Sequence, residues 1–107
     1  MCGIYGTTIS YEDHQVKAKL ERILFRGPDK SDYKSYQHEG SRVTLGHNRL
    51  SIIDLDPRSN QPLTYYNNIH IVFNGEIYNF KDFQRVSYGN FQEFIYYFKP
   101  HKIIAIN

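Results

Sequence analysis

The sequence predicts an α+β fold built around antiparallel β-sheet, with flanking helices. β-forming runs outnumber the helical pattern, which occurs once, and the turns between the runs are short. The 107 residues provide one domain, and a chain of this length buries roughly two thirds of its unfolded surface. With 40% hydrophobic and 22% charged residues, the composition is that of an ordinary globular domain.

The N-terminal third predicts a strand followed by a helix. β-forming side chains dominate residues 3–9, which favours a strand there. A helix is expected over residues 14–25, because apolar side chains recur on one helical face. These side chains are Val16, Leu20, Ile23 and Leu24. The sequence Arg-Gly-Pro-Asp at residues 26–29 ends the helix, since glycine and proline are helix-terminating residues.

The remainder of the chain predicts further strands joined by loops. Two β-rich runs, residues 33–38 and 43–53, flank the sequence Glu-Gly-Ser. Two prolines interrupt residues 55–62, which indicates a loop. Residues 69–73 are strongly β-forming, and residues 103–106 suit a buried strand.

The composition excludes several classes of function. Thirteen basic and eleven acidic residues give a net charge of +2, too small to indicate binding to nucleic acid or to an anionic membrane. No apolar run approaches the ~20 residues of a membrane-spanning helix, and the N-terminus lacks the features of a signal peptide. One cysteine excludes an internal disulfide, and no histidine spacing indicates a metal site. We therefore expect a cytoplasmic protein without a bound metal.

Cys2 is a candidate nucleophile. Removal of Met1 would leave a thiol and a free α-amine on the same residue. In model compounds the amine titrates at about pH 7.7–8.0 and the thiol at about pH 8.5, so the amine accepts the thiol proton near neutral pH. One residue then supplies both nucleophile and base, as in catalysis by an N-terminal threonine. Alternatively, Cys2 packs as a small apolar residue without a chemical role.

The dipeptide formed by Asn74 and Gly75 has two interpretations. Asn-Gly between β-forming runs is a strong signal for a hairpin turn. The same pair can form an oxyanion hole, in which the Asn74 side-chain amide and a neighbouring backbone N–H donate to a developing negative oxygen. The two interpretations are compatible if the turn lies beside the nucleophile.

Arg49 is a candidate ligand for a carboxylate. It lies within a β-forming and partly apolar run, where a guanidinium can form two parallel hydrogen bonds with the carboxylate of a substrate. Alternatively, it points outward from a half-exposed strand, which is the usual place for an arginine. The residues alone leave both alternatives open.

Five sequence blocks follow one another in a definite order. They are Met-Cys-Gly-Ile-Tyr-Gly at 1–6, Arg-Gly-Pro-Asp at 26–29, Gly-His-Asn-Arg-Leu-Ser-Ile-Ile-Asp at 46–54, Asn-Gln-Pro at 60–62 and Asn-Gly-Glu-Ile-Tyr-Asn at 74–79. Together they resemble the N-terminal glutaminase domain of class II glutamine amidotransferases, the N-terminal-nucleophile (Ntn) hydrolase type. The last block resembles asparagine synthetases more closely than other members of the class. The resemblance covers about residues 1–80.

The resemblance implies an Ntn-hydrolase fold, in which two antiparallel sheets lie between helical layers as an αββα sandwich. It also implies a truncated domain, with residues 1–80 as the partial domain and residues 81–107 as a divergent tail. The first sheet is then expected to lose the sheet that covers it, and strands are left with open edges. This predicts marginal stability or self-association, unless the aromatic, isoleucine-rich tail covers the exposed surface.

The resemblance implies glutamine as the substrate and assigns roles to matching residues. Cys2 attacks the side-chain amide of glutamine and forms a thioester, with its own α-amine as the base. Asn74, through its side chain, and Gly75, through its backbone N–H, form the oxyanion hole. The residues expected to bind the substrate are Arg49, at the α-carboxylate, and Leu50, Ile52 and Glu76 around the pocket. Hydrolysis yields glutamate and ammonia and needs no cofactor.

In the family, the ammonia passes to a synthetase domain that uses ATP and Mg²⁺ to make asparagine, and we expect that domain to be absent here. The family's Ser-Asp-Thr-Glu segment, whose aspartate binds the glutamine amine, is replaced by Phe-Gln-Glu-Phe at residues 91–94. Two hypotheses therefore stand side by side. The chain is a glutaminase, or it is a weak or inactive remnant that binds a partner, such as a separate synthetase subunit or another copy of itself.

Overall fold

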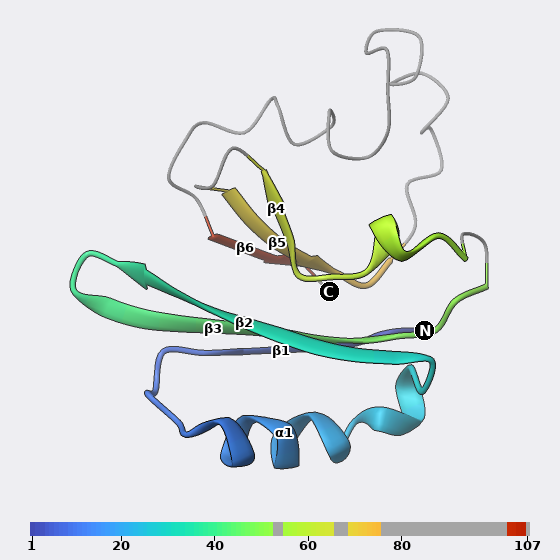
Figure 1. Ribbon diagram of the computed structural model, residues 1–107, viewed down its shortest axis with the longest axis horizontal. Helices are drawn as coiled ribbons and strands as arrows, with labels where there is room; N and C mark the ends of the chain where they lie inside the picture. Colours follow the sequence, from blue (N-terminus) through green and yellow to red (C-terminus); the bar gives the residue numbers. More distant parts are fainter. Residues whose placement is uncertain (53–54, 66–68, 76–102, 107) are drawn as a thin grey trace, which may run out of the picture.

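The computed structural model describes residues 1–52, 55–65 and 69–75 and the backbone of residues 103–106. Three layers are stacked: helix α1 (Asp13–Glu21), a first sheet beside it, and a second sheet on the far side of the first (Figure 1). Each sheet has three strands. The fold is mixed α and β with few helices, as the sequence predicts. No helix in the described ranges is both long and apolar enough to span a membrane.

The first sheet is antiparallel throughout, with β3 between β1 and β2. Its strands are β1 (Gly3–Thr7), β2 (Lys30–His38) and β3 (Ser41–Arg49). A two-residue turn joins β2 to β3, and its residues Glu39 and Gly40 have φ angles of 48° and 78°. Positive φ at both positions is typical of a type I′ turn, whose twist matches that of the strands it joins.

The two longer strands of this sheet are shifted against the predicted runs of residues 33–38 and 43–53. β2 begins earlier, because the Asp29 N–H donates to the Arg49 carbonyl at 3.0 Å and continues the ladder. β3 ends earlier, at Arg49. Two residues later the Ser51 N–H donates to a side chain, the Asp29 carboxylate, at 2.6 Å. Both boundaries depend on a contact between distant segments, which local β propensity does not contain.

Helix α1 is shorter than the predicted helix over residues 14–25. Its first turn is stabilised by the Glu12 N–H, which donates to the Gln15 side-chain oxygen at 2.9 Å. Of the predicted apolar stripe, Val16 and Leu20 are buried in α1, whereas Ile23 is half-buried and Leu24 is exposed, both beyond the end of the helix. The Leu20 carbonyl accepts a hydrogen bond from the Asn48 side chain at 2.8 Å and another from the Ile23 N–H, three residues on, at 3.1 Å. The chain tightens instead into a short 3₁₀ helix, η1 (Leu24–Arg26).

The second sheet contains β4 (Leu63–Tyr65), β5 (Ile69–Phe73) and β6 (Ile103–Ile106) in that order. β5 and β6 have the predicted bounds, whereas the three-residue β4 is too short for its pattern to indicate a strand. β4 and β5 are antiparallel, but β5 and β6 are parallel, so the expectation of purely antiparallel sheet is wrong for this pair. A parallel pair needs a crossover connection of a dozen or more residues, and the chain between β5 and β6 is long enough to provide one.

The second sheet covers the first, contrary to the expectation that the first sheet loses its cover (Figure 1). β3 and β5 contact each other across the interface. A short 3₁₀ helix, η2 (Pro57–Ser59), lies in the predicted loop that leads from the first sheet to the second. Residues 103–106 of the predicted tail form β6, and residues 76–102 lie outside the described part of the chain.

Part of the contact between the sheets is polar and aromatic. Tyr36 of β2 stacks on His70 of β5, with ring centroids 3.5 Å apart. The Thr64 hydroxyl lies 3.1 Å from His70 Nδ1 and 3.4 Å from the Tyr36 hydroxyl. Burial lowers the pKa of His70, and the positive charge of Lys34 lowers it further. The neutral imidazole is therefore the form that this contact accommodates.

His47 lies in the middle of β3 and is only 1% exposed. Within the described ranges neither ring nitrogen has a partner at hydrogen-bonding geometry. The Phe73 backbone is nevertheless near enough to affect the pKa of the ring. Burial lowers the pKa of His47 to about 4; the Phe73 backbone opposes this shift and the Arg49 charge adds to it. Protonating His47 would place an extra charge in the interior, so the fold favours the neutral ring.

We predict that the fold loses stability in mild acid because of His47. Its pKa falls from 6.5 to about 4 on folding, so the stabilisation is complete above pH 6.5 and is lost as the pH falls toward 4. A shift of that size corresponds to about 3 kcal/mol of unfolding free energy. Urea denaturation of the wild type at a series of pH values between 7.5 and 4 measures it, and His47→Gln should flatten the curve in this range.

The matched control is His38→Gln, because His38 is exposed at the end of β2. This variant should keep the pH dependence of the wild type. Equal pH dependence in His47→Gln and the wild type would contradict the assignment to His47.

Candidate active site

Cys2 precedes β1 and lies against the end of β3. The pairing of Gly3 with Asn48 places it there. The half-buried Sγ atom lies 3.4 Å from the Leu50 amide nitrogen and 4.0 Å from the Leu50 carbonyl oxygen. A thiol can donate to a carbonyl, and sulfur can accept from an N–H. The Leu50 backbone therefore offers a partner to both protonation states of the sulfur.

A pocket of about 210 Å³ opens beside Cys2. Its described lining residues are Cys2, Ile4, Ile23, Arg26 and Asn74. They come from the start of the first sheet, the helical segment and the end of β5, so both sheets contribute to the pocket. A cysteine, an asparagine and an arginine therefore lie around one small space.

Arg26 is a pocket residue to which the sequence analysis assigned no role. Its Nε donates to the Cys2 carbonyl oxygen at 3.2 Å and so holds the main chain of the nucleophile candidate from the helical side. Arg26 belongs to the Arg-Gly-Pro-Asp block, which was interpreted as a helix end and as a mark of the family. Its place in a block with a fixed sequence was the available signal, but the contact with Cys2 spans 24 positions and has no local pattern.

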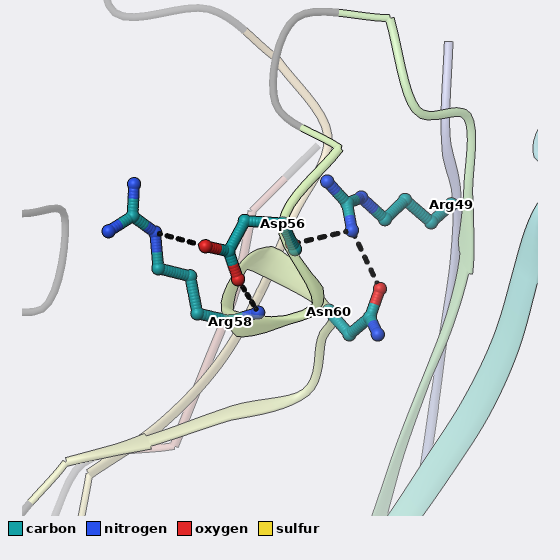
Figure 2. Close-up of polar contacts among 4 residues, drawn as sticks. All are labelled: Arg49, Asp56, Arg58 and Asn60. Atoms are coloured by element: carbon teal, nitrogen blue, oxygen red, sulfur yellow. Dashed lines mark hydrogen bonds and ion pairs between the residues drawn. The ribbon is translucent and has the colours of Figure 1, made fainter.

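Arg49 is 7% exposed at the end of β3 and extends away from the strand toward η2 (Figure 2). One terminal nitrogen, Nη1, donates to the Asn60 side-chain oxygen at 2.8 Å and to the Asp56 backbone carbonyl at 3.1 Å. The Asp56 carboxylate accepts from the Arg58 N–H at 2.9 Å and lies 3.6 Å from Arg58 Nε. The neighbouring loop thus fixes the direction of the Arg49 guanidinium, and neither Asp56 nor Asn60 was singled out from the sequence.

The loop after η1 presses against the end of β3 at Gly27. A Cβ atom on Gly27 would lie 2.2 Å from the Asn48 carbonyl oxygen and 2.7 Å from the Arg49 carbonyl carbon. Real Cβ atoms do not come that close to backbone, so the loop can reach this position only with glycine. This contact brings Arg26 and Asp29, on either side of Gly27, to the segment that carries Leu50.

The structure brings together three of the residues predicted to form the site. Cys2 and Asn74, 72 positions apart in the sequence, line the same pocket, and the Leu50 backbone contacts the Cys2 sulfur. Gly75 follows Asn74 and is exposed. Whether Asn74 and Gly75 form a hairpin turn depends on later residues, which lie outside the described ranges.

The other predicted residues are placed differently. Arg49 and Ile52 are not among the described residues of the pocket lining, and Ile52 is 73% exposed. Glu76 lies outside the described residues. Among the described residues, no cluster of three or more histidine, cysteine or acidic side chains could hold a metal ion.

Comparison with known proteins decides the family. The model of a glutamine amidotransferase domain matches residues 1–95. The chain belongs to this glutamine amidotransferase family. It is 36% identical over 88 residues to asparagine synthetase [glutamine-hydrolyzing] 1 of Bacillus subtilis, a match that covers 75% of this chain and 13% of the relative.

Further relatives of this amidotransferase domain bear two kinds of name. Asparagine synthetase B [glutamine-hydrolyzing] of Escherichia coli is 34% identical over 100 residues, covering 88% of this chain and 17% of its own length. Amidase chry2 of Gibberella zeae is 42% identical over 72 residues, a match that covers 65% of this chain and 10% of the relative. The chain thus spans less than a fifth of the length of these relatives. No solved structure gives a significant match.

We predict that Gly27→Ala destabilises the amidotransferase domain by about 3 kcal/mol, because the added methyl group would force the loop away from the Asn48 carbonyl. Gly6→Ala is the matched control, since its Cβ would lie at an ordinary 3.7 Å from the Leu45 side chain. The control should change the unfolding free energy by no more than about 0.5 kcal/mol. Urea denaturation compares the two, and equal stability of both variants would contradict the close approach.

Proposed function

We propose that this domain hydrolyses glutamine to glutamate and ammonia, with Cys2 as the nucleophile. The observation that carries the proposal is the pocket shared by Cys2 and Asn74, in a chain of the glutamine amidotransferase family. Attack on an amide carbonyl requires a nucleophile and a donor for the oxygen that becomes negative. A pocket lined by a cysteine and an asparagine offers the residue types that can supply both.

In the first half of the proposed reaction, Met1 has been removed and the free α-amine of Cys2 accepts the thiol proton. The sulfur attacks the side-chain amide carbon of glutamine, a C–S bond forms, and the carbonyl oxygen becomes an oxyanion. The Asn74 side-chain amide and the Gly75 backbone N–H donate to this oxyanion. The protonated amine then returns its proton to the substrate nitrogen, the C–N bond breaks, and ammonia leaves a thioester behind.

In the second half, water attacks the thioester carbon and a second oxyanion occupies the same donors. The α-amine accepts a proton from the water, and the C–S bond breaks. The sulfur takes the proton back, and glutamate leaves. The balance is one glutamine and one water converted to glutamate and ammonia, without an oxidant or reductant. We therefore propose that this half-reaction uses no metal or cofactor.

We assign the α-carboxylate of the substrate to Arg49 and the pocket wall to Leu50, Ile52 and Glu76. Two observations support Arg49 in this role. The residue adjoins Leu50, whose backbone contacts the Cys2 sulfur, and its guanidinium is directed by the oxygens of the η2 loop. A guanidinium of fixed direction loses little conformational freedom when it binds a carboxylate.

We assign the use of ammonia to a separate region or chain. Relatives named asparagine synthetases are several times longer than this chain, so ATP and Mg²⁺ would act in a synthetase part that receives the ammonia.

We further propose that α1 and the two sheets belong to the αββα sandwich of Ntn hydrolases. The order of the three layers supports this assignment. A reduced catalytic thiol suits the cytoplasm, where we place the reaction.

We predict that Cys2→Ala abolishes glutamine hydrolysis, because the variant lacks the attacking sulfur. Glutamate release from glutamine measures this, with intact mass spectrometry to establish that Met1 has been removed. Cys2→Ala should keep the thermal melting curve of the wild type, so that loss of activity is not loss of fold. Unchanged hydrolysis in Cys2→Ala would refute the proposal.

The same assay distinguishes the alternative, in which the chain is a remnant that binds a partner. A folded wild-type chain without Met1 that releases no glutamate would exclude the glutaminase. Gel filtration with a synthetase subunit at micromolar concentration would then test for binding.

We predict that Asn74→Ala lowers kcat roughly a hundred- to a thousandfold and changes KM little. The loss of one oxyanion donor removes stabilisation of the transition state, whereas the ground-state amide is bound much as before. Steady-state hydrolysis of glutamine measures both constants. An increase in KM with an unchanged kcat would place Asn74 in substrate binding instead.

A further inference from the structure

The backbone of Leu50 lies between two side chains that come from different parts of the sequence. The Cys2 sulfur contacts Leu50 itself, and Asp29, from the loop after η1, contacts the Arg49 carbonyl and the Ser51 N–H on either side of it. Two peptide planes meet at Leu50. In a trans peptide the C=O and the N–H point in opposite directions, so a contact at one end of a plane sets the direction of the other end.

The peptide plane between Arg49 and Leu50 is held at both ends. The Arg49 carbonyl accepts from the Asp29 N–H at 3.0 Å, and the Leu50 N–H points at the Cys2 sulfur at 3.4 Å. The peptide plane between Leu50 and Ser51 is held in the same way. The Ser51 N–H donates to the Asp29 carboxylate at 2.6 Å, and the Leu50 carbonyl lies 4.0 Å from the sulfur.

We propose that Asp29 is a positioning residue that holds the Leu50 backbone against the Cys2 sulfur. Its backbone N–H aims the Leu50 N–H at the sulfur, and its carboxylate aims the Leu50 carbonyl at the same atom. Asp29 does not touch the substrate in this role. The inference deepens the proposed function, because it concerns the reactivity of the nucleophile assigned there.

The two contacts on sulfur act in turn as the proton moves. The thiol donates its proton toward the Leu50 carbonyl, and after the proton has gone to a base the thiolate accepts from the Leu50 N–H. A hydrogen bond to an ionised acceptor is stronger than one between neutral groups. Asp29 therefore favours the thiolate through its backbone N–H, which directs the Leu50 N–H, and the neutral thiol through its carboxylate, which directs the Leu50 carbonyl. Removing the carboxylate releases the Leu50 carbonyl and leaves the contact that directs the Leu50 N–H in place.

The charged groups around the sulfur also act on its ionisation. Arg26, from η1, lies at the Cys2 carbonyl, and Arg49, from β3, is directed toward η2. The Met1 amine adjoins Cys2 until Met1 is removed, and Asp29 lies behind Leu50. Removing the negative charge of Asp29 would make the thiolate easier to form, and so would removing the hydrogen bond that holds the Leu50 carbonyl. A variant that loses the hydrogen bond and keeps the charge therefore separates positioning from charge.

The test is the rate of Cys2 alkylation by iodoacetamide as a function of pH. The chain has one cysteine, so the mass increase reports this sulfur alone. In Asp29→Ala the pH of half-maximal rate should fall by roughly one pH unit. The rate at pH 7 should rise about threefold, because a tenfold gain of thiolate is partly offset by its lower nucleophilicity. Asp29→Asn keeps an acceptor oxygen and loses only the charge, so it should shift the profile in the same direction by less than Asp29→Ala.

Two more variants make the result decisive. Ser51→Pro removes the same hydrogen bond from the donor side and keeps the Asp29 charge, so it should shift the profile in the direction of Asp29→Ala. Asp32→Ala is the matched control, because Asp32 also accepts a backbone N–H, that of Tyr33 at 2.9 Å, but on β2. It should leave the profile unchanged. Circular dichroism establishes that each variant is folded.

Superposition of the Asp29→Ala and Ser51→Pro profiles on that of the wild type would overturn the proposal. Equal shifts in Asp29→Ala and Asp29→Asn, together with a wild-type profile in Ser51→Pro, would also overturn it, because they would assign the effect to charge. If Asp29→Ala does not fold, Ser51→Pro and Asp29→Asn decide the question. Glutamine hydrolysis is measured in a separate assay. If the wild-type chain does not hydrolyse glutamine, the proposed function is contradicted, but the alkylation result still holds.

Discussion

The backbone of Gly27 lies so close to the end of β3 that a Cβ atom there would be 2.2 Å from the Asn48 carbonyl oxygen. This approach joins the helical layer to the first sheet at the place where Cys2 lies. Arg26 and Asp29 flank Gly27, and they hold the Cys2 carbonyl and the Leu50 peptide planes. Because the backbones must touch for these contacts to form, the geometry around the sulfur depends on a residue without a side chain.

The second sheet contributes the other half of the site and part of the stability. β5 carries Asn74 at its end, so the packing of β5 on β3 brings that amide to the pocket of Cys2. The same packing buries His47 and places His70 against Tyr36, where neutral imidazole rings are favoured. The interface that contributes to the pocket from two sheets therefore also holds the two histidines whose protonation the fold disfavours.

The sequence indicated candidate groups for the site better than the contacts that support them. Cys2 and Asn74 were candidates because a thiol beside an α-amine can act as a nucleophile and an asparagine amide can donate to an oxyanion, and the family resemblance assigned them these roles. The structure brings both residues to one pocket. Arg26, Asn60 and Asp29 were not assigned roles, since ordinary polar side chains have no pattern that indicates which distant backbone they contact. Sequence blocks located these residues, but hydrogen bonds between segments far apart in the chain gave them partners.

Local sequence determined the type and approximate place of most elements, including the bounds of β5 and β6 and the apolar face of α1. These follow from side-chain periodicity and β propensity, which act over a few residues. Tertiary structure decided where α1, β2 and β3 begin or end, that β6 runs parallel to β5, and that a second sheet covers the first. The physical reason is that the contacts behind these features, such as those of Gly27 and Asp29 with the end of β3 and the pairing of β5 with β6, join residues 20 or more positions apart. Their energies depend on a register that no local window of sequence contains.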